Sequence, residues 1–238
     1  MIRVLIDAIP EAGSPVEIRG DERHYLVDVR RRGAGDTFEL VARTEGRRAI
    51  AAILEVRGNL VVAEVRELLD AAQAIRAVHV LTAVPKRDLM EDVVRRLSEL
   101  GVARLTPVAA SLSVVAPGEA KLARWRRIAD EAVRQCGRGK PLEIDPPTPL
   151  ADALRGVDAA ARLVLDPRAP QTRFSDACGR AKSIAVAIGP EGGFTSEELE
   201  LAAALGFFPI CLGGTILRIE TAAIAAAVLA VDALGMGT

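Results

Sequence analysis

The sequence predicts an α/β protein with a mostly parallel sheet, preceded by a small β-barrel domain. In residues 1–69, short runs rich in β-branched residues are separated by glycine-bearing turns, which is typical of an all-β unit. From about Arg76 onward, strand-like runs alternate with amphipathic helices, which is the pattern of a parallel sheet covered by helices. We therefore place one domain at residues 1–69 and a second at residues 73–238, with a linker at residues 68–74.

The first domain is expected to contain several short strands and one helix. Its opening residues indicate a strand rather than a signal peptide, because Asp7 interrupts their apolar run. We expect further strands at residues 36–42, 48–54 and 59–65, and a short helix at residues 21–31. The regular spacing of turn sequences between these runs favours a small barrel.

The second domain is expected to alternate strands with helices. We expect strands at residues 77–84, 103–108, 162–166, 183–188 and 208–212, and helices at residues 88–100, 119–135 and 220–234. A further helix is expected between Thr195, which opens a capping box with Glu198, and the terminating Gly206; Gly101 ends the first helix in the same way. The last helix is apolar on nearly every side, so we expect it to be buried in the core or at a subunit interface.

The helix at residues 119–135 combines an apolar stripe with a basic face. Between Lys121 and Lys140, seven basic residues stand against two acidic ones, although the whole chain has a net charge of −1. Such a local patch can bind phosphates, or it can be a solvated helix face, and charge alone does not decide between the two. The residues expected to be buried are Leu122, Trp125, Ile128, Ala129, Ala132 and Val133.

Composition argues against several classes of protein. There is no apolar run of about 18 residues, so we expect no transmembrane helix and a cytoplasmic location. The three cysteines lack Cys-x-x-Cys spacing and the chain has two histidines, so we expect neither a disulfide framework nor a metal site.

Two glycine-bearing turns are the strongest functional signal. The sequence GPEGG at residues 189–193 follows the strand at 183–188, and the sequence LGGTILRIETA at residues 212–222 follows the strand at 208–212. Turns at the carboxyl ends of neighbouring parallel strands form a crevice for a small ligand. The first turn is not Gly-x-Gly-x-x-Gly, and Pro190 lacks the N–H group that a phosphate cradle would use. The pair therefore favours an uncharged group such as adenine or a thioether.

Several charged residues near these turns are candidates for function. Arg218 enters the apolar last helix, where it either forms an ion pair with Glu220 or Glu191, or orients an anionic group of a ligand. Four basic residues in turns or at the ends of elements either contact RNA phosphates or belong to the solvated surface. These candidate RNA-binding residues are Arg30, Lys86, Arg87 and Arg138.

Together these motifs resemble the RsmE family, the 16S rRNA uridine-N3 methyltransferases of the SPOUT class. Residues 188–193 and 212–222 carry the resemblance most specifically. Weaker matches lie at residues 24–30, 35–36, 86–90, 98–102, 125–129, 135–138 and 166–168, and at Pro107 and Pro141.

The resemblance implies a C-terminal SPOUT domain with a trefoil knot and an N-terminal PUA-like RNA-binding barrel. It implies transfer of a methyl group from S-adenosylmethionine (SAM) to N3 of the uridine at position 1498 of 16S rRNA, by a homodimer whose partner is this rRNA or the small ribosomal subunit. The residues that would bind SAM are Leu165, Ile188, Gly189, Pro190, Glu191, Gly192, Gly193, Leu212, Gly213, Ile216, Leu217, Arg218, Thr221 and Ala222.

Two of these residues are assigned catalytic roles. The cation of Arg218 can stabilise the negative charge that develops on uridine, and Glu191 can accept the N3 proton. Alternatives are a SPOUT methyltransferase for another RNA position, a non-catalytic RNA-binding ribosome-assembly factor, and an α/β enzyme that uses another nucleotide and no RNA.

Four positions depart from the family pattern. Ser111 and Leu112 stand where Glu-Arg is usual, Arg134 stands at a usual Glu, and Thr215 stands at the first Arg of Leu-Gly-x-Arg-Ile-Leu-Arg. These departures change charged residues around loops that otherwise match. They bear on the RNA target and on activity more than on SAM binding.

Overall fold

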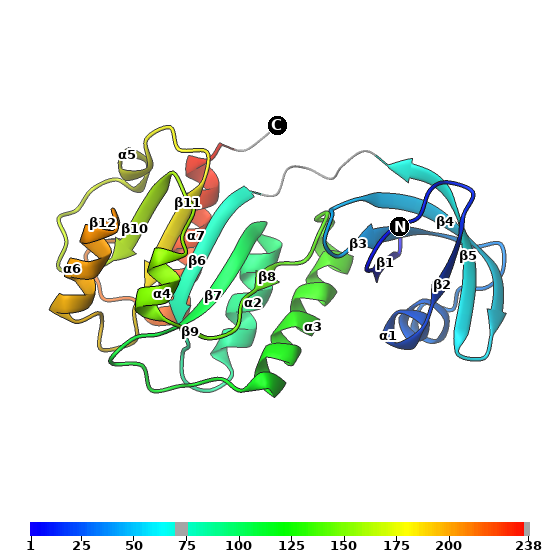
Figure 1. Ribbon diagram of the computed structural model, residues 1–238, viewed down its shortest axis with the longest axis horizontal. Coiled ribbons are helices and arrows are strands. Elements are labelled where there is room, and N and C mark those ends of the chain that lie inside the picture. Colours follow the sequence, from blue (N-terminus) through cyan, green and yellow to red (C-terminus); the bar gives the residue numbers. More distant parts are fainter. Residues whose placement is uncertain (70–75, 236–238) are drawn as a thin grey trace. The chain divides into compact units, whose positions relative to one another are not determined.

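The computed structural model describes residues 1–69 and 76–235, which form two compact units (Figure 1). The first unit contains residues 1–69 and 130–141, and the second contains residues 76–129 and 142–235. Helix α3 (Glu119–Cys136) therefore begins in the second unit and ends in the first. Most of the linker expected at residues 68–74 lies outside the described residues.

The first unit is built on a curled five-stranded sheet (Figure 1). Its order is β1-β3-β4-β5-β2, with β1 and β3 parallel and the other pairs antiparallel. Alternating burial along β5 turns Val61, Ala63 and Val65 toward the core, which is the period expected for a sheet with one covered face. The strands are β1 (Arg3–Ile6), β2 (Pro15–Ile18), β3 (Thr37–Ala42), β4 (Arg48–Arg57) and β5 (Leu60–Leu69).

The helix expected at residues 21–31 is present, but most of it is wound more widely than an α-helix. A single turn, α1 (Gly20–Arg23), continues into the π-helical η1 (His24–Val29). The N–H of Arg30 donates to the carbonyl oxygen of Tyr25, five residues earlier, at 2.9 Å. Leu26 is completely buried and fixes this helix on the sheet.

The end of α3 is bound to the first unit by a cluster of charges around Glu22. Glu22 is 8% exposed, and its carboxylate accepts hydrogen bonds from Arg134 on α3 and from Arg43 at 3.4 Å. Arg43 also pairs with Asp130 of α3, and the guanidinium of Arg134 lies 4.7 Å from the centre of the Tyr25 ring. Arg134, which departs from the family pattern, therefore has a structural partner in this protein.

The second unit is a parallel sheet with helices on both faces (Figure 1). The sheet order is β12-β10-β11-β6-β7-β8, β9 also pairs with β7, and every described pair is parallel. The strands are β6 (Arg76–Ala83), β7 (Val102–Ala109), β8 (Glu143–Ile144), β9 (Thr148–Pro149), β10 (Ala161–Leu165), β11 (Ile184–Ile188) and β12 (Phe208–Ile210). The α/β class with a mostly parallel sheet is confirmed.

The helices divide into two groups by their contacts. Helix α7 lies on β6 and β11, with α2 and α5 beside it, whereas α4 and α6 contact each other and lie against β7, β9 and β12. Gly101 and Gly206, with φ of 80° and 81°, follow α2 and α6 as expected. The helices of this unit, besides α3, are α2 (Leu89–Glu99), α4 (Leu150–Arg155), α5 (Phe174–Cys178), α6 (Ser196–Ala204) and α7 (Ile219–Ala233).

In the single chain the last helix is buried on one face, and burial of its other face at a subunit interface stays a prediction. Ala222, Ala226 and Ala230 of α7 are buried, but Val228 is 45% and Leu229 is 38% exposed. The reason is that α7 lies on the sheet with one face and presents the other to solvent.

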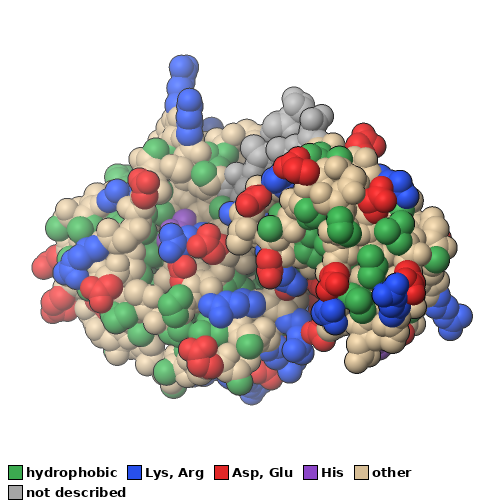
Figure 2. Space-filling view, turned by 45° about the vertical axis from the view of Figure 1, so that its right-hand side comes forward, with side chains coloured by type: hydrophobic (Ala, Val, Ile, Leu, Met, Phe, Trp, Pro, Cys, Tyr) green, Lys and Arg blue, Asp and Glu red, His purple; other side chains and the backbone are tan. Residues whose placement is uncertain are grey.

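No helix in the described part of the chain is long and apolar enough to cross a membrane. On the face drawn in Figure 2, acidic and basic side chains are interspersed, as the near-zero net charge suggests.

A polar chain within the sheet involves His79 of β6. Its Nε2 atom lies 2.7 Å from Oγ1 of Thr106 on β7, and the Thr106 hydroxyl donates to Asp145, which also pairs with Arg104 at 2.8 Å. Because the Thr106 proton is used on Asp145, His79 donates through Nε2. Burial, with a smaller contribution from Arg104, lowers the pKa of His79 to about 4.

We expect this histidine to make stability fall in acid. Between a pKa of 6.5 in the unfolded chain and about 4 in the folded protein, the unfolded state binds more protons. The free energy of unfolding should therefore drop by about 3 kcal/mol as the pH falls through this window. In His79→Gln the drop measured by urea unfolding should be smaller by about this amount. Parallel curves for wild type and His79→Gln would contradict the assignment.

Candidate functional site

Three loops at the carboxyl ends of β10, β11 and β12 surround one pocket in the second unit. These three strands lie near one edge of the sheet, and all run in the same direction, so their loops meet at one end of it. The walls are mainly aliphatic, and few polar side chains reach them. The pocket is lined by Leu165, Asp166, Pro167, Ile188, Gly189, Pro190, Glu191, Gly193, Ile210, Cys211, Leu212, Thr215, Ile216, Leu217, Ile219 and Ala222.

The loop after β11 is a tight turn whose shape requires glycine. The N–H of Gly193 donates to the carbonyl oxygen of Pro190 at 2.8 Å, and Gly193 has a φ of 74°. A Cβ atom on Gly189 would lie 3.2 Å from the ring of Phe194, tighter than normal packing. The turn leads into α6 through the expected capping box of Thr195 and Glu198. Backbone can therefore approach a ligand closely here.

The two carboxylates at the pocket have different partners. Asp166 accepts from the backbone N–H and from Nε of Arg168, each at 3.0 Å, so it is held in place. Glu191 is 44% exposed, and its carboxylate lies 4.0 Å from Nζ of Lys86. Glu191 is thus the carboxylate that remains free to interact with a substrate, while Asp166 shapes its own loop.

Arg218 is the N-cap residue of α7 and is exposed. Among the described residues it forms neither of the ion pairs considered from the sequence, with Glu220 or with Glu191. A cation at the positive end of a helix dipole gains nothing from that position. Its placement beside the pocket therefore favours a role with a ligand or substrate over a structural role.

The structure brings most of the predicted SAM-binding residues together. Ten of them line the pocket: Leu165, Ile188, Gly189, Pro190, Glu191, Gly193, Leu212, Ile216, Leu217 and Ala222. Gly192, Gly213, Arg218 and Thr221 belong to the same loops or to the first turn of α7 but do not line it.

Six lining residues are absent from the predicted SAM-binding set, although four of them lie in segments that resemble the cofactor loops of the family, at residues 166–168 and 212–222. Asp166 and Cys211 directly follow β10 and β12, so their position at a strand end was a usable signal. Thr215 lies in the loop that had been identified, at a position that departs from the family pattern. The set is Asp166, Pro167, Ile210, Cys211, Thr215 and Ile219.

The four predicted RNA-binding residues have different environments. Arg30 is exposed and donates to the Tyr25 hydroxyl at 3.0 Å, and Lys86 and Arg87 are exposed after β6. Arg87 has a φ of 61°, unusual for a residue with a side chain. Arg138 differs, because burial lowers the pKa of its guanidinium to about 10. Its phosphate-binding role is therefore the weakest of the four.

The chain matches the family model described as RNA methyltransferase domain over residues 72–231. Ribosomal RNA small subunit methyltransferase E of Mycobacterium bovis is 30% identical over 92% of this chain and 86% of its own length. The same-named protein of Synechocystis is 33% identical over 59% of this chain, and the match spans about half (48%) of that relative.

Two solved structures resemble the whole chain. A Legionella pneumophila protein in complex with the bound cofactor SAM is 30% identical, with a TM-score of 0.87, over 98% of this chain and 97% of the other. Ribosomal RNA small subunit methyltransferase E from Neisseria gonorrhoeae bound to SAM is 25% identical, with a TM-score of 0.83, over 95% of each chain. The chain therefore belongs to the RNA methyltransferase domain family and, within it, to the ribosomal RNA small subunit methyltransferase E proteins.

Proposed function

We propose that this protein transfers the methyl group of SAM to N3 of a uridine in 16S rRNA, at position 1498 by its family resemblance. The observation that carries the proposal is the pocket formed by the loops after β10, β11 and β12. The sequences of these loops are the ones that resemble the RsmE family, and similar structures were solved with SAM.

The residues of the pocket suit SAM. Aliphatic side chains such as Ile188, Leu212 and Leu217 offer flat apolar walls for adenine, and the glycine turn exposes backbone groups for its polar edge. Asp166 places negative charge near a ligand that carries a sulfonium cation. The ligand supplies an electrophilic methyl group, whose C–S bond breaks as the bond to N3 forms.

The remaining chemistry falls to the side chains of this protein. N3 of uridine loses its proton, and Glu191, free of a tight ion pair, is the acceptor we propose. Arg218 stabilises the negative charge on the pyrimidine as that proton leaves. Holding N3 in line with the methyl group contributes much of the acceleration.

The other parts of the proposal concern RNA and assembly. The curled sheet of the first unit supports a PUA-like barrel with Arg30 on its surface, and Lys86 and Arg87 would contact RNA beside the pocket. The trefoil knot rests on the family resemblance, because true knots are rare. Exposed Val228 and Leu229 on α7 support a homodimer. A bacterial rRNA substrate entails a cytoplasmic location.

Glu191→Gln tests the proton acceptor. We expect SAM affinity, measured by calorimetry, to stay near wild type, because the amide keeps the size of the side chain. Turnover should fall by about a hundredfold, because the general base is lost. Glu200→Gln, at an exposed acid of α6, should leave both quantities unchanged. Unchanged turnover in Glu191→Gln would remove Glu191 from the mechanism.

A further inference from the structure

Residues 110–113, directly after β7, form a tight turn that lies beside the β11–α6 loop. The N–H of Ser113 donates to the carbonyl oxygen of Ala110 at 3.0 Å, and the N–H of Ala110 donates to the Ser113 hydroxyl at 3.0 Å. These two bonds close the turn on itself. Its two central residues, Ser111 and Leu112, are therefore available for contacts with other elements.

The first contact joins the turn to the start of α6 through one carboxylate. The backbone N–H of Ser111 donates to Oε1 of Glu198 at 2.7 Å. The other oxygen of Glu198 accepts from the N–H of Thr195 at 2.9 Å, as part of the capping box. Hydrogen bonds to an ionised acceptor are stronger than neutral ones. Glu198 thus joins the turn to Thr195, two residues after the glycine loop.

The second contact places a side chain against the glycine loop. A Cβ atom on Gly192 would lie 2.9 Å from Cδ1 and 3.4 Å from Cβ of Leu112. The Leu112 side chain therefore occupies the space that any side chain at position 192 would need. Leu112 remains 48% exposed, so burial in the core does not explain its placement.

The glycine loop needs outside support. Residues 189–193 include three glycines, which lose more conformational freedom on folding than other residues. Within the described residues, the hydrogen bond from Gly193 to Pro190 is the one backbone bond between members of this loop. Contacts from a neighbouring element can restrict it further.

We infer that Leu112 and Glu198 are positioning residues, which hold the loop at residues 189–193, and Glu191 with it, in the conformation that binds SAM and accepts the proton. This inference rests on the proposed function. It gives the departure at Leu112 a role, because an apolar side chain packs against the glycine loop where the family pattern has an arginine. The bond from Ser111 uses its backbone N–H, so it does not depend on the side chain at that position.

A double-mutant cycle at Leu112 and Gly192 tests the steric contact. Leu112→Ala removes the support, and Gly192→Ala breaks the same contact by displacing either the Leu112 side chain or the loop. Each should therefore weaken SAM binding about three- to tenfold in calorimetry. The double variant removes the clash and partly refills the space, so it should bind SAM better than Gly192→Ala alone. Leu112→Met should retain affinity. Additive losses in the double variant would overturn the inference.

Glu198 offers a matched test of the hydrogen bond. Glu198→Gln should raise the KM for SAM and lower kcat while leaving the KM for RNA unchanged. Thr195→Ala removes the other half of the capping box but keeps the bond from Ser111, so it should lower thermal stability and spare SAM binding. Equal effects of the two variants on SAM binding would assign the effect to helix capping instead.

Hydrogen exchange separates this inference from the proposed function. The Gly193 amide, bonded to Pro190, should exchange faster in Leu112→Ala than in wild type without any ligand, at an unchanged melting temperature. If wild type binds no SAM, the proposed function fails, yet this measurement still tests the contact. Unchanged exchange of the Gly193 amide would overturn the positioning role.

Discussion

Arg218→Met is expected to lower kcat by about 10²- to 10³-fold, because it removes the cation that stabilises charge on the uridine as N3 loses its proton. SAM affinity should change little, because Arg218 begins α7 beside the pocket and does not line it. Its exposed position and lack of a described carboxylate partner make the cation available to a substrate. Single-turnover methyl transfer at saturating SAM measures this step directly.

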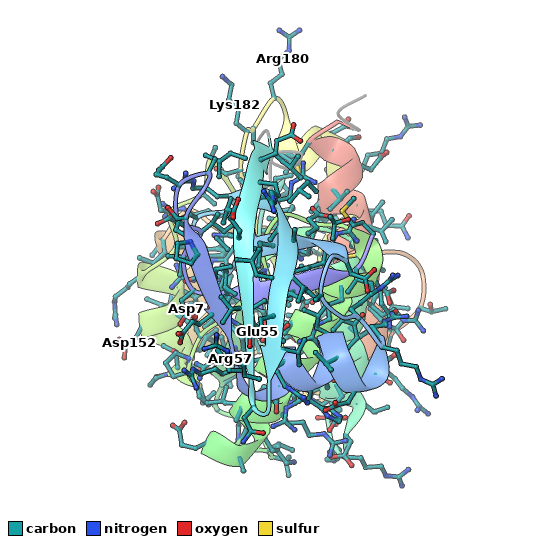
Figure 3. All side chains as sticks on the ribbon, turned by 90° about the vertical axis from the view of Figure 1, so that its right-hand side faces the viewer. Asp7, Glu55, Arg57, Asp152, Arg180 and Lys182 are labelled. Carbon is teal, nitrogen blue, oxygen red and sulfur yellow. The ribbon has the colours of Figure 1, made fainter. Side chains whose placement is uncertain are left out.

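The control for Arg218 is an arginine that is equally exposed and outside the site. Arg180, in the loop between α5 and β11, extends away from the body of the second unit together with Lys182 (Figure 3). Arg180→Met should retain wild-type kcat, and Arg218→Lys should recover part of it. A kcat for Arg218→Met within threefold of wild type would exclude the electrostatic role.

Glu22→Ala is expected to lower the free energy of unfolding of the first unit by about 3 kcal/mol, as for removal of one partner from a buried ion pair. The carboxylate is mostly buried and accepts from two arginines, Arg134 and Arg43, as well as from the N–H of Leu5 at 3.1 Å. Its loss leaves the two guanidinium groups close together without their shared partner. Arg134→Glu should be at least as damaging, because it places a second carboxylate beside Glu22.

The stability of Glu22→Ala is measured by urea unfolding, monitored with a signal that reports on the first unit. Tyr25 is the single tyrosine and lies against Arg134, so its near-ultraviolet circular dichroism reports on the first unit. The exposed pair of Glu17 and Arg19 is the control, and Glu17→Gln should cost less than about 1 kcal/mol. Similar small losses in Glu22→Ala and Glu17→Gln would show that the buried cluster does not stabilise the fold.

The sequence predicted the elements that are specified by local signals, such as helical spacing of apolar residues and capping residues. The stripe on α3, including Trp125 at 2% exposure, is buried as its helical spacing predicted, and the capping box of Thr195 and Glu198 forms. The two glycine turns follow short apolar strands, and parallel strands bring their carboxyl ends together. The pocket could therefore be predicted from the order of its elements.

Features that depend on distant contacts could not be predicted in this way. Strand β2 (Pro15–Ile18) begins with proline and has a single fully buried residue, so it lacks a local signal. The packing of Leu112 against Gly192 joins residues 80 positions apart in the sequence. The ion pair of Arg134 with Glu22 also joins distant residues, and it binds the end of α3 to the first unit.

Methyl transfer from labelled SAM to small ribosomal subunits from cells that lack this modification is the most direct test of the central claim. The nucleotide that receives the label is then mapped by mass spectrometry. The account predicts N3-methyluridine at position 1498, formed by wild type and lost in Arg218→Met. Binding of SAM without transfer to the subunit, or transfer to another nucleotide, would contradict it.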